Sequence, residues 1–313
     1  MVWRMQEKNL SKNTRRLKNM NSRSEILFLY DVKWANPNGD PLDENKPRID
    51  EETEKCIVSD VRLKRTIRDE LQENGEIIWV SGESVNPDKR RGELGIKDKT
   101  DALKCIDVRL FGAVIPISKQ ADTSFTGPVQ FRPGTSLHAV KVVFQQGTAA
   151  FTSGEQAQQR SFREEYLIPY ALICFYGIAN ENAAKITKLT EEDIKKLLNA
   201  MWNGTKNLIT RSKMEHNPRL LLRVVYKEGI NYHIGELDSY IKLLSDIEEK
   251  SIRDTAQIKL DISELLTKLS QNKEKIDHIE YKEDGRLKLV KNGEDIILKN
   301  ELDNLGLRAV ALQ

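Results

Sequence analysis

The chain has 313 residues, of which 39% are hydrophobic and 31% charged, so we expect a buried core beneath a strongly charged surface. The formal net charge is only +2, so overall basicity gives no argument for a nucleic-acid role, which would have to rest on local patches. The mean hydropathy is −0.55, no apolar run approaches the roughly 20 residues of a membrane span, and no signal peptide is visible, so no membrane association is expected.

The cysteines and histidines predict neither a disulfide framework nor a metal site. Cys56, Cys105 and Cys174 are odd in number and far apart in sequence, which is typical of a reduced, cytoplasmic protein. The four histidines show no ligand spacing, so we expect no metal and no other cofactor.

Residues 1–20 form a basic arm with little apolar periodicity, and we expect the arm to be flexible. It holds six Lys or Arg and one acid, a balance of +5, which leaves −3 for the rest of the chain. Two interpretations stay open. The arm is either an extension upstream of the natural start, because Met20 directly precedes the first expected strand, or an RNA-binding tail.

The first strand and the loop after it are the most distinctive stretch. Residues 26–31 are apolar on both faces, which predicts a central strand covered on both sides. The loop at 36–41 reads NPNGDP, and its prolines, glycine and Asn/Asp side chains predict a stiff, shaped connection. Such a loop is either an ordinary turn or a place for binding groups.

A helix is expected over 57–71, with Leu63, Ile67 and Leu71 on one apolar stripe. Four of the seven residues from 62 to 68 are cations: Arg62, Lys64, Arg65 and Arg68. They form a phosphate-binding face or a solvated one, and their position directly after the shaped loop favours phosphate.

The middle of the chain is expected to alternate strands with insertions. We predict a strand at 77–80, an inserted polar lobe over 81–104, an ordered element at 105–111, and turn chemistry around 126–132. A strand at 136–145 should lead into a protruding loop at 146–160 that carries a lone aromatic, Phe151. Residues 166–178 read as a buried central strand, with Pro169 at its start or at a bulge.

The last part of the core is expected to be a helix and a strand. Thr190 is an N-cap candidate before three acids, and Gly204 is a plausible helix stop. A basic connector over 205–218 then precedes a strand at 220–226. Residues 236–313 hold 13 Lys or Arg against 17 acids, with a helix expected near 261–269 and short strands around Gly285 and Gly293.

Without its insertions, this order reads β-α-β-β-α-β, so the predicted fold class is α+β with a ferredoxin-like arrangement that RNA-recognition modules share. No RNP-type aromatic signature marks the strands. RNA would therefore be held by loops and backbone contacts rather than by stacking on the sheet.

Six ordered blocks resemble a known family. They are NPNGDP at 36–41, SDVRLKRTIRDEL at 59–71, DVRLFGA at 107–113, TGPVQFRPGTSLHAV at 126–140, EYLIPYALICFYGIAN at 165–180 and MWNGTKNLITRSKME at 201–215. Together, over about residues 25–230, they resemble the Cas-seven family, the repeated backbone subunit of type I CRISPR surveillance complexes (Cascade), and most closely its type I-B group.

The resemblance implies a palm over 21–235, with a finger insertion at about 81–135 and a thumb at about 146–162, and a C-terminal extension, 236–313, packed on the palm. It implies copies aligned head to tail along one CRISPR RNA (crRNA), which pairs with target DNA. The other implied partners are further Cascade subunits: the crRNA 5′-handle-binding subunit, the large and small subunits and the crRNA-processing endonuclease.

Carried over to this sequence, the resemblance implies guide-RNA contacts from the shaped loop, the cationic helix, the TGPVQF block and the basic connector. The candidate residues are Asn36, Asn38, Arg62, Lys64, Arg65, Arg68, Gln130, Arg132, His138, Lys206, Arg211 and Lys213, with Phe151 as a wedge in the thumb or an anchor for its own loop.

Three functions remain in competition. The first is a non-catalytic guide-RNA-binding subunit. The second is a metal-dependent ribonuclease of the type III backbone kind, with Asp40 as its acid, although Asp40 between Gly39 and Pro41 is also explained by turn formation. The third is a scaffold that binds only protein, with the cationic helix as a solvated face.

Overall fold

The computed structural model describes residues 18–82, 86–117, 123–152 and 160–313, and the side chains of 148–152 and 160–163 fall outside the description. The predicted α+β class is confirmed. Within the described residues the main sheet has nine strands. They are β1 (Ser24–Ala35), β4 (Lys55–Val58), β7 (Val129–Phe131), β8 (Gly134–Ala139), β9 (Val143–Thr152), β10 (Arg160–Ala179), β11 (His216–Tyr226), β14 (Ile276–Glu283) and β17 (Ala309–Ala311).

The strand order is β17-β14-β11-β1-β10-β8-β4, with β7 and β9 also paired to β10. The helices are α1 (Asp60–Glu73), α2 (Pro87–Glu93), α3 (Ile106–Phe111), α4 (Glu181–Thr187), α5 (Glu191–Lys206), α6 (Ser263–Gln271) and α7 (Leu298–Asn304). Shorter strands are β2 (Gly39–Asp40), β3 (Lys46–Pro47), β5 (Gly112–Val114), β6 (Ser124–Thr126), β12 (Lys242–Leu244), β13 (Lys259–Asp261), β15 (Lys288–Lys291) and β16 (Glu294–Ile296).

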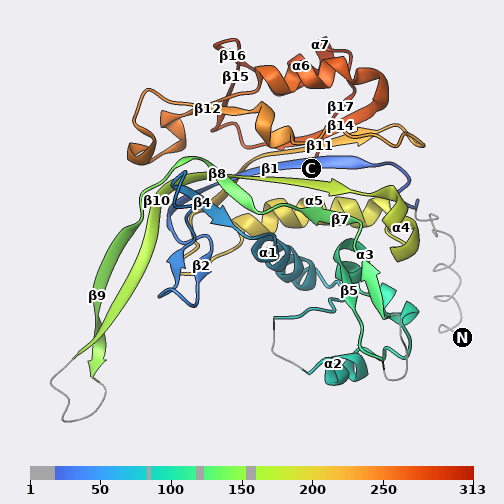
Figure 1. The fold of residues 1–313 in the computed structure, drawn as a ribbon, viewed down its shortest axis with the longest axis horizontal. Helices are drawn as coiled ribbons and strands as arrows, with labels where there is room; N and C mark the ends of the chain where they lie inside the picture. The colour runs from blue at the N-terminus through green and yellow to red at the C-terminus, as the bar shows by residue number, and fades with distance from the viewer. Residues whose placement is uncertain (1–17, 83–85, 118–122, 153–159) are drawn as a thin grey trace, which may run out of the picture.

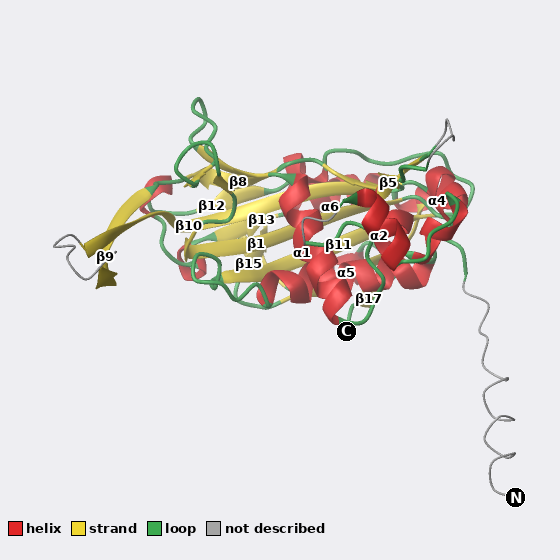
Figure 2. Ribbon diagram, turned by 90° about the horizontal axis from the view of Figure 1, so that it is seen from below, coloured by secondary structure: helices red, strands yellow, loops and turns green. Residues whose placement is uncertain are grey.

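The molecule has three layers, with the sheet in the middle (Figure 1). Helices α1 and α5 cover the lower face of the sheet, as the view from below shows (Figure 2). The residues after β11 that lie outside the main sheet, including α6 and α7, cover the upper face, and we call them the C-terminal layer. Ile26 and Phe28 of β1 therefore belong to the lower core, and the alternate residues Leu27 and Leu29 belong to the upper core. This double coverage explains why β1 is apolar on both faces.

Local sequence signals start the two main helices where the structure has them. Ser59 caps α1 by accepting a hydrogen bond from the Arg62 amide, and Thr190 forms a capping box with Asp193 at the start of α5. The helix predicted from residue 57 begins at Asp60 instead, because Ile57 lies in β4. The two helices pack against each other and against the lower core.

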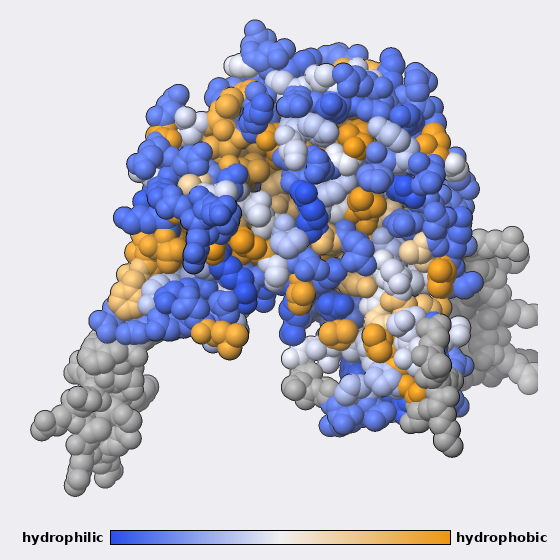
Figure 3. Space-filling model, in the orientation of Figure 1, coloured by the Kyte–Doolittle hydropathy of each residue, from blue (hydrophilic) through white to orange (hydrophobic). Residues whose placement is uncertain are grey.

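Two parts project from the layers and leave the surface hollowed between them (Figure 3). One is a lobe containing α2, α3 and β5, with its own small core around Trp79 and Val108. The other is an arm, in which β9 pairs antiparallel with the first half of β10 from Leu167↔Val143 to Arg160↔Thr152. The loop expected at 146–160 is thus largely strand in its described part, and 153–159 lie outside the described residues.

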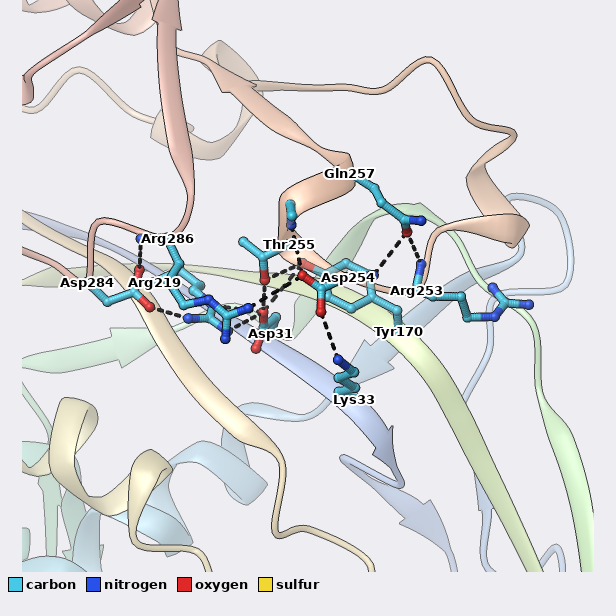
Figure 4. A network of polar contacts seen from close by, with 11 residues as sticks. Asp31, Lys33, Tyr170, Arg219, Arg253, Asp254, Thr255, Gln257, Asp284 and Arg286 are labelled. Atoms are coloured by element: carbon cyan, nitrogen blue, oxygen red, sulfur yellow. Dashed lines mark hydrogen bonds and ion pairs between the residues drawn. The ribbon is translucent and has the colours of Figure 1, made fainter.

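A buried polar network joins the C-terminal layer to β1 (Figure 4). Arg219 of β11 forms ion pairs with Asp31 at 2.7 Å and with Asp284, and the Thr255 hydroxyl also donates to Asp31. Burial raises the pKa of Asp31, although the Arg219 charge opposes the shift. The layer therefore carries polar groups that are complementary only when it is docked on the sheet.

Several sequence predictions are wrong in detail. Residues 77–80 form no strand; the amides of Trp79 and Val80 donate to the Asp107 carboxylate instead. The strand expected at 136–145 is divided between β8 and β9. Gly204 does not stop α5: a Cβ there would lie 2.9 Å from the Glu70 Cβ, so the glycine permits close approach to α1.

Pro169 is neither at a strand start nor at a bulge but inside the 20-residue strand β10. It lies close to the point where the pairing of β10 changes: up to Leu167 the strand pairs with β9, and from Ile168 onward it pairs with β1. A proline is tolerated there because its position opposite Trp34 is left out of the ladder.

Residues 1–17 of the expected basic arm lie outside the described residues. Lys18 and Met20 are described, and their backbones bond to Glu191 and Leu189. The Met20 side chain is fully buried in the lower core. The boundary between the basic N-terminal arm and the core therefore lies before residue 20 rather than after it.

Candidate nucleic-acid interface

The shaped loop after β1 is held in place mainly by backbone contacts. The Asn36 amide donates to Ser212 O at 2.7 Å, and its side-chain Nδ2 donates to Asn45 O at 2.7 Å. Asn36 is 2% exposed, and its Oδ1 has no hydrogen-bond partner in the described part of the chain. Because this oxygen is out of contact with solvent, Asn36 serves as a buried anchor at the start of the loop rather than as a surface contact.

Asn38 and Asp40 stabilise the loop itself. Asn38 Oδ1 accepts from the amide and the hydroxyl of Ser59, the N-cap of α1, at 2.8 and 2.9 Å. The Asp40 carboxylate accepts from the Leu42 amide and pairs with Arg48 at 3.0 Å. These contacts join the loop to the helix and favour the turn-forming interpretation of Asp40.

Two cations beside this loop form no ion pair with any carboxylate in the part of the chain that the structure describes. They are Arg62, on the first turns of α1, and Lys213, whose Nζ donates to Asn36 O at 2.8 Å. Within the described residues, the Arg62 guanidinium donates to the Thr66 hydroxyl at 3.4 Å and forms no other side-chain hydrogen bond. His216 lies beside them, 3% exposed, with its Nε2 unpartnered. We call Asn36, Arg62, Lys213 and His216 the cation pocket.

The electrostatics of the cation pocket favour a negatively charged ligand. Burial, and then the neighbouring Arg62 charge, lower the pKa of Lys213 to about 8. Burial, followed by the charges of Lys213 and Arg62, lowers the pKa of His216 to about 3, so the imidazole is neutral at pH 7. Clustered positive charges that repel one another bind an anion such as phosphate well.

A second hollow, of about 720 Å³, lies at the base of the arm, and we call it the arm-base hollow. Lys46, Arg48, Phe144 and Tyr166 are among its lining residues. The Lys46 Nζ lies 5.2 Å from the centre of the Tyr166 ring, and the Phe144 ring lies 5.1 Å from the same ring. The Arg48 Nε is buried without a partner in the described residues. Asp40, Asp43 and Glu51 also line this hollow, and Lys46 and Arg48 pair with carboxylates, so the hollow offers a ligand the exposed Phe144 ring rather than an available cation.

Comparison with known proteins identifies the family. The family model described as CRISPR-associated protein Cas7 matches residues 22–263. A CRISPR-associated protein Cas7 from Haloferax volcanii is 35% identical over 303 aligned residues, covering 86% of this chain and 88% of that protein.

The chain belongs to the Cas7 family.

Solved structures agree at the level of the fold. A chain of a "CRISPR RNA-guided surveillance complex, pre-nicking" covers 92% of this chain and 96% of its own length, with a TM-score of 0.56 and 13% identity. A chain of a "CRISPR RNA-guided surveillance complex" covers 91% and 94%, with a TM-score of 0.52 and 17% identity. Both likenesses extend over nearly the whole Cas7 chain, including the C-terminal layer.

Three of the four cations predicted on α1 of this Cas7 protein already have carboxylate partners. Lys64 pairs with Asp60 at 2.9 Å, and Arg65 pairs with Asp69 at 2.7 Å. Arg68 pairs with the buried Asp107 at 3.0 Å and lies over the Phe111 ring. The helix therefore presents Arg62, rather than an even cationic face, to a ligand.

The TGPVQF block does not come together with the cation pocket. Gln130 is exposed and contacts Lys64 and Gly127. Arg132 pairs with Asp238 of the C-terminal layer and lies over the Tyr176 ring. His138 is 1% exposed, accepts from the Leu172 amide and stacks on Tyr170, and burial lowers its pKa. His138 thus packs in the interior.

The remaining predicted residues extend from the cation pocket or fall outside the description. Lys206 is exposed at the end of α5, and Arg211 pairs with Glu165 at 3.4 Å near the loop. The backbone of Phe151 lies in β9, but its side chain is outside the described residues. Of the predicted set, the structure brings together Asn36, Arg62 and Lys213.

Sequence reasoning missed His216 and the arm-base residues. A single histidine before an apolar strand carries no spacing signal, and its place beside Arg62 depends on the pairing of β1 with β11. Phe144 and Tyr166 lie on different strands, so their contact depends on the β9–β10 register. The run Lys46-Pro47-Arg48 was the one local signal that could have indicated this hollow.

The described residues contain neither a metal-binding cluster nor a membrane-spanning helix. No group of three or more His, Cys, Asp or Glu is arranged to hold a metal ion, and Cys56, Cys105 and Cys174 are buried free thiols. Among the described helices, none combines the length and the apolar character that crossing a bilayer requires.

Proposed function

We propose that this Cas7 protein binds the phosphate backbone of a single-stranded guide RNA at the cation pocket. The observation that carries the proposal is the convergence of Arg62 and Lys213, neither with a carboxylate partner in the described residues, beside the loop that contains Asn36. Two partly buried cations at the surface beside a stiff loop fit the phosphate of a ribose-phosphate unit, because each can donate charge-assisted hydrogen bonds to phosphate oxygens.

The fold in this proposal is a ferredoxin-like palm with finger and thumb insertions. The order β11-β1-β10-β8, with α1 and α5 together on one face, supports a βαββαβ palm in which β8 takes the place expected for 77–80. In this proposal the lobe with α2 and α3 is the finger, supported by its separate small core, and the β9–β10 arm is the thumb, supported by its projection from the sheet. The hollow between them accommodates the RNA (Figure 3).

In the assembly that we propose, copies of this chain line up head to tail along one crRNA in a type I-B Cascade complex in the cytoplasm. The crRNA then pairs with target DNA. The protein holds the sugar-phosphate backbone of the crRNA and does not read its base sequence. The 5′-handle-binding subunit, the large and small subunits and the processing endonuclease complete the set of partners. The names of the two similar complexes support the part of this proposal that places the chain in an RNA-guided complex.

Salt dependence of RNA binding tests the cation pocket. Arg62→Ala and Lys213→Ala should each weaken binding of a single-stranded RNA and lower the slope of log affinity against log salt by about 1, because each removes one phosphate contact. Lys195→Ala, at an exposed lysine near the start of α5, is the matched control and should change neither quantity. Unchanged slopes in both pocket variants would contradict the proposed site.

The proposed subunit is non-catalytic, and Asp40 tests the ribonuclease alternative. Its carboxylate is engaged by Leu42 and Arg48, which favours a role in the turn. Labelled RNA incubated with the protein and a divalent cation should remain intact. Cleavage by the native protein that disappears in Asp40→Ala would replace this proposal with the ribonuclease.

The protein-only scaffold is tested by co-expression with a guide RNA. Purified protein should carry RNA, with protection at regular short intervals when the bound RNA is sequenced. Material that carries no nucleic acid and shows no salt-dependent RNA binding would favour the scaffold.

A further inference from the structure

Trp34, at the end of β1, has a backbone conformation that bulky residues rarely adopt. Its φ is +46°, in the left-handed region, and 47% of the residue is exposed. A non-glycine residue of this size is disfavoured there, and such outliers gather where structure serves binding. The other two described tryptophans, Trp79 and Trp202, are buried.

The conformation turns the Trp34 side chain away from the lower core. Tyr30 and Val32 are on the lower face of β1, so regular alternation would place Trp34 there as well. Instead Ala35 joins that core and Trp34 is exposed. The flanking pairs Lys33↔Tyr170 and Ala35↔Ile168 leave Trp34 opposite Pro169, which has no N–H to donate at this position.

The segment beside Trp34 brings it close to the cation pocket. The amide of Lys33 donates to Glu215 O at 3.0 Å, and the amide of Asn36 donates to Ser212 O at 2.7 Å. Residues 213 and 214 therefore run directly alongside Trp34 in antiparallel fashion. Lys213 is one of the two unpaired cations, and the next residue, Met214, is 60% exposed.

An exposed indole beside a phosphate-binding cation is suited to a nucleobase. Single-stranded nucleic-acid sites combine cations for the backbone with aromatic faces for the bases. Two apolar side chains offer far less than the roughly 1,200 Å² of total buried surface in a specific protein–protein interface. Because residue 213 runs alongside Trp34, the indole is placed to meet a base that neighbours a phosphate bound at Lys213.

Resting on the function proposed above, we propose that Trp34 is a stacking residue for a base of the guide RNA, adjacent to the phosphate held by Arg62 and Lys213. The stacking is independent of base identity, because every base offers a flat face. The left-handed backbone at Trp34 is the structural feature that presents the ring to the RNA.

Trp34→Asn is the variant that tests the proposal, because asparagine tolerates a positive φ and lacks the ring. It should be at least as stable as the native protein and should bind a single-stranded RNA of about 12 nucleotides roughly tenfold more weakly. The salt slope should stay at the native value, and Trp34→Phe should retain most of the affinity. Ile186→Ala, which removes another exposed apolar side chain on α4, is the matched control and should bind as the native protein does.

An abasic oligomer with the same sugar-phosphate backbone separates the possible outcomes. Trp34→Asn and native protein should bind this oligomer equally, because it has no base to stack. Equal binding of normal RNA by the two proteins would overturn the stacking role while leaving the proposed function intact. Failure of the native protein to bind any RNA would overturn both. Normal binding of the short RNA with defective assembly on a long guide would assign Trp34 to a contact with a second copy instead.

Discussion

Lys213 should give the proposed interface a pH dependence, because burial and the Arg62 charge lower the pKa of its ammonium to about 8. The free protein therefore carries the charge below pH 8 and loses it as the pH rises above 8. RNA affinity should be highest below pH 8 and fall by up to tenfold per pH unit above it, since bound phosphate needs the charged form.

The pH effect is measured by anisotropy of a labelled RNA across this range. Lys213→Arg keeps its charge at all these pH values and should flatten the profile. A native profile that is equally flat would show that the Lys213 charge does not act in binding.

Arg68 differs from Arg62 although both were predicted to touch RNA. Arg68→Met would leave the Asp107 carboxylate, of which 1% is exposed, without its countercharge. We expect a loss of about 3 kcal/mol in the free energy of unfolding. Arg62→Met removes no ion pair of the described chain and should change stability little. Urea denaturation of both variants measures this difference; an Arg68→Met protein of native stability with weaker RNA binding would instead place Arg68 at the RNA.

At the scale of elements, the contact of α1 with α5 positions the cation pocket, because Arg62 and the connector after α5 approach it from the two helices. Gly204 allows this approach: an added Cβ would lie 2.9 Å from the Glu70 Cβ and 3.1 Å from Thr66 O. Gly204→Ala should therefore destabilise the protein by about 1 kcal/mol despite the better helix propensity of alanine.

Gly92→Ala in α2 is the control for that substitution, since nothing lies within 4 Å of a Cβ at Gly92. It should leave the midpoint of thermal unfolding unchanged or slightly raised. If Gly204→Ala behaves in the same way, the two helices have room that the contact distances do not indicate.

At the scale of the whole molecule, the C-terminal layer and the central strand depend on each other. Arg219→Met would leave Asp31 and Asp284 without their shared cation beneath that layer. The free energy of unfolding should fall by about 3–5 kcal/mol, which corresponds to a fall of about 10 °C in the midpoint of thermal unfolding. The double variant Asp31→Leu with Arg219→Met should recover part of that loss. An Arg219→Met protein of native stability would show that the network does not hold the layers together.

Local patterns were sufficient for the elements whose signals are contained within one segment. The two-sided apolar run of β1, the stripe and cap of α1, and the Thr190 cap of α5 each express an arrangement of neighbours along the chain. The segment at 77–80 and Gly204 were misassigned because their conformations are decided by distant partners, Asp107 and Glu70. The β9–β10 arm was not predicted as strand, because its residues are small and polar and only the pairing of β9 with β10 makes them extended.

For the interface, the amino-acid sequence determined which residues were candidates: a shaped loop, a helix with four cations and a basic connector. Only the tertiary structure decided which cations are available to a ligand, since a charge is neutralised by whichever carboxylate the fold brings near it. Arg65 and Lys64 find theirs one helical turn away, and Arg68 finds Asp107 39 residues along the chain. Within the described residues, Arg62 and Lys213 pair with no carboxylate. Lys213 is brought beside the end of β1 by the antiparallel passage of 212–216, an arrangement set by long-range strand pairing that no local pattern records.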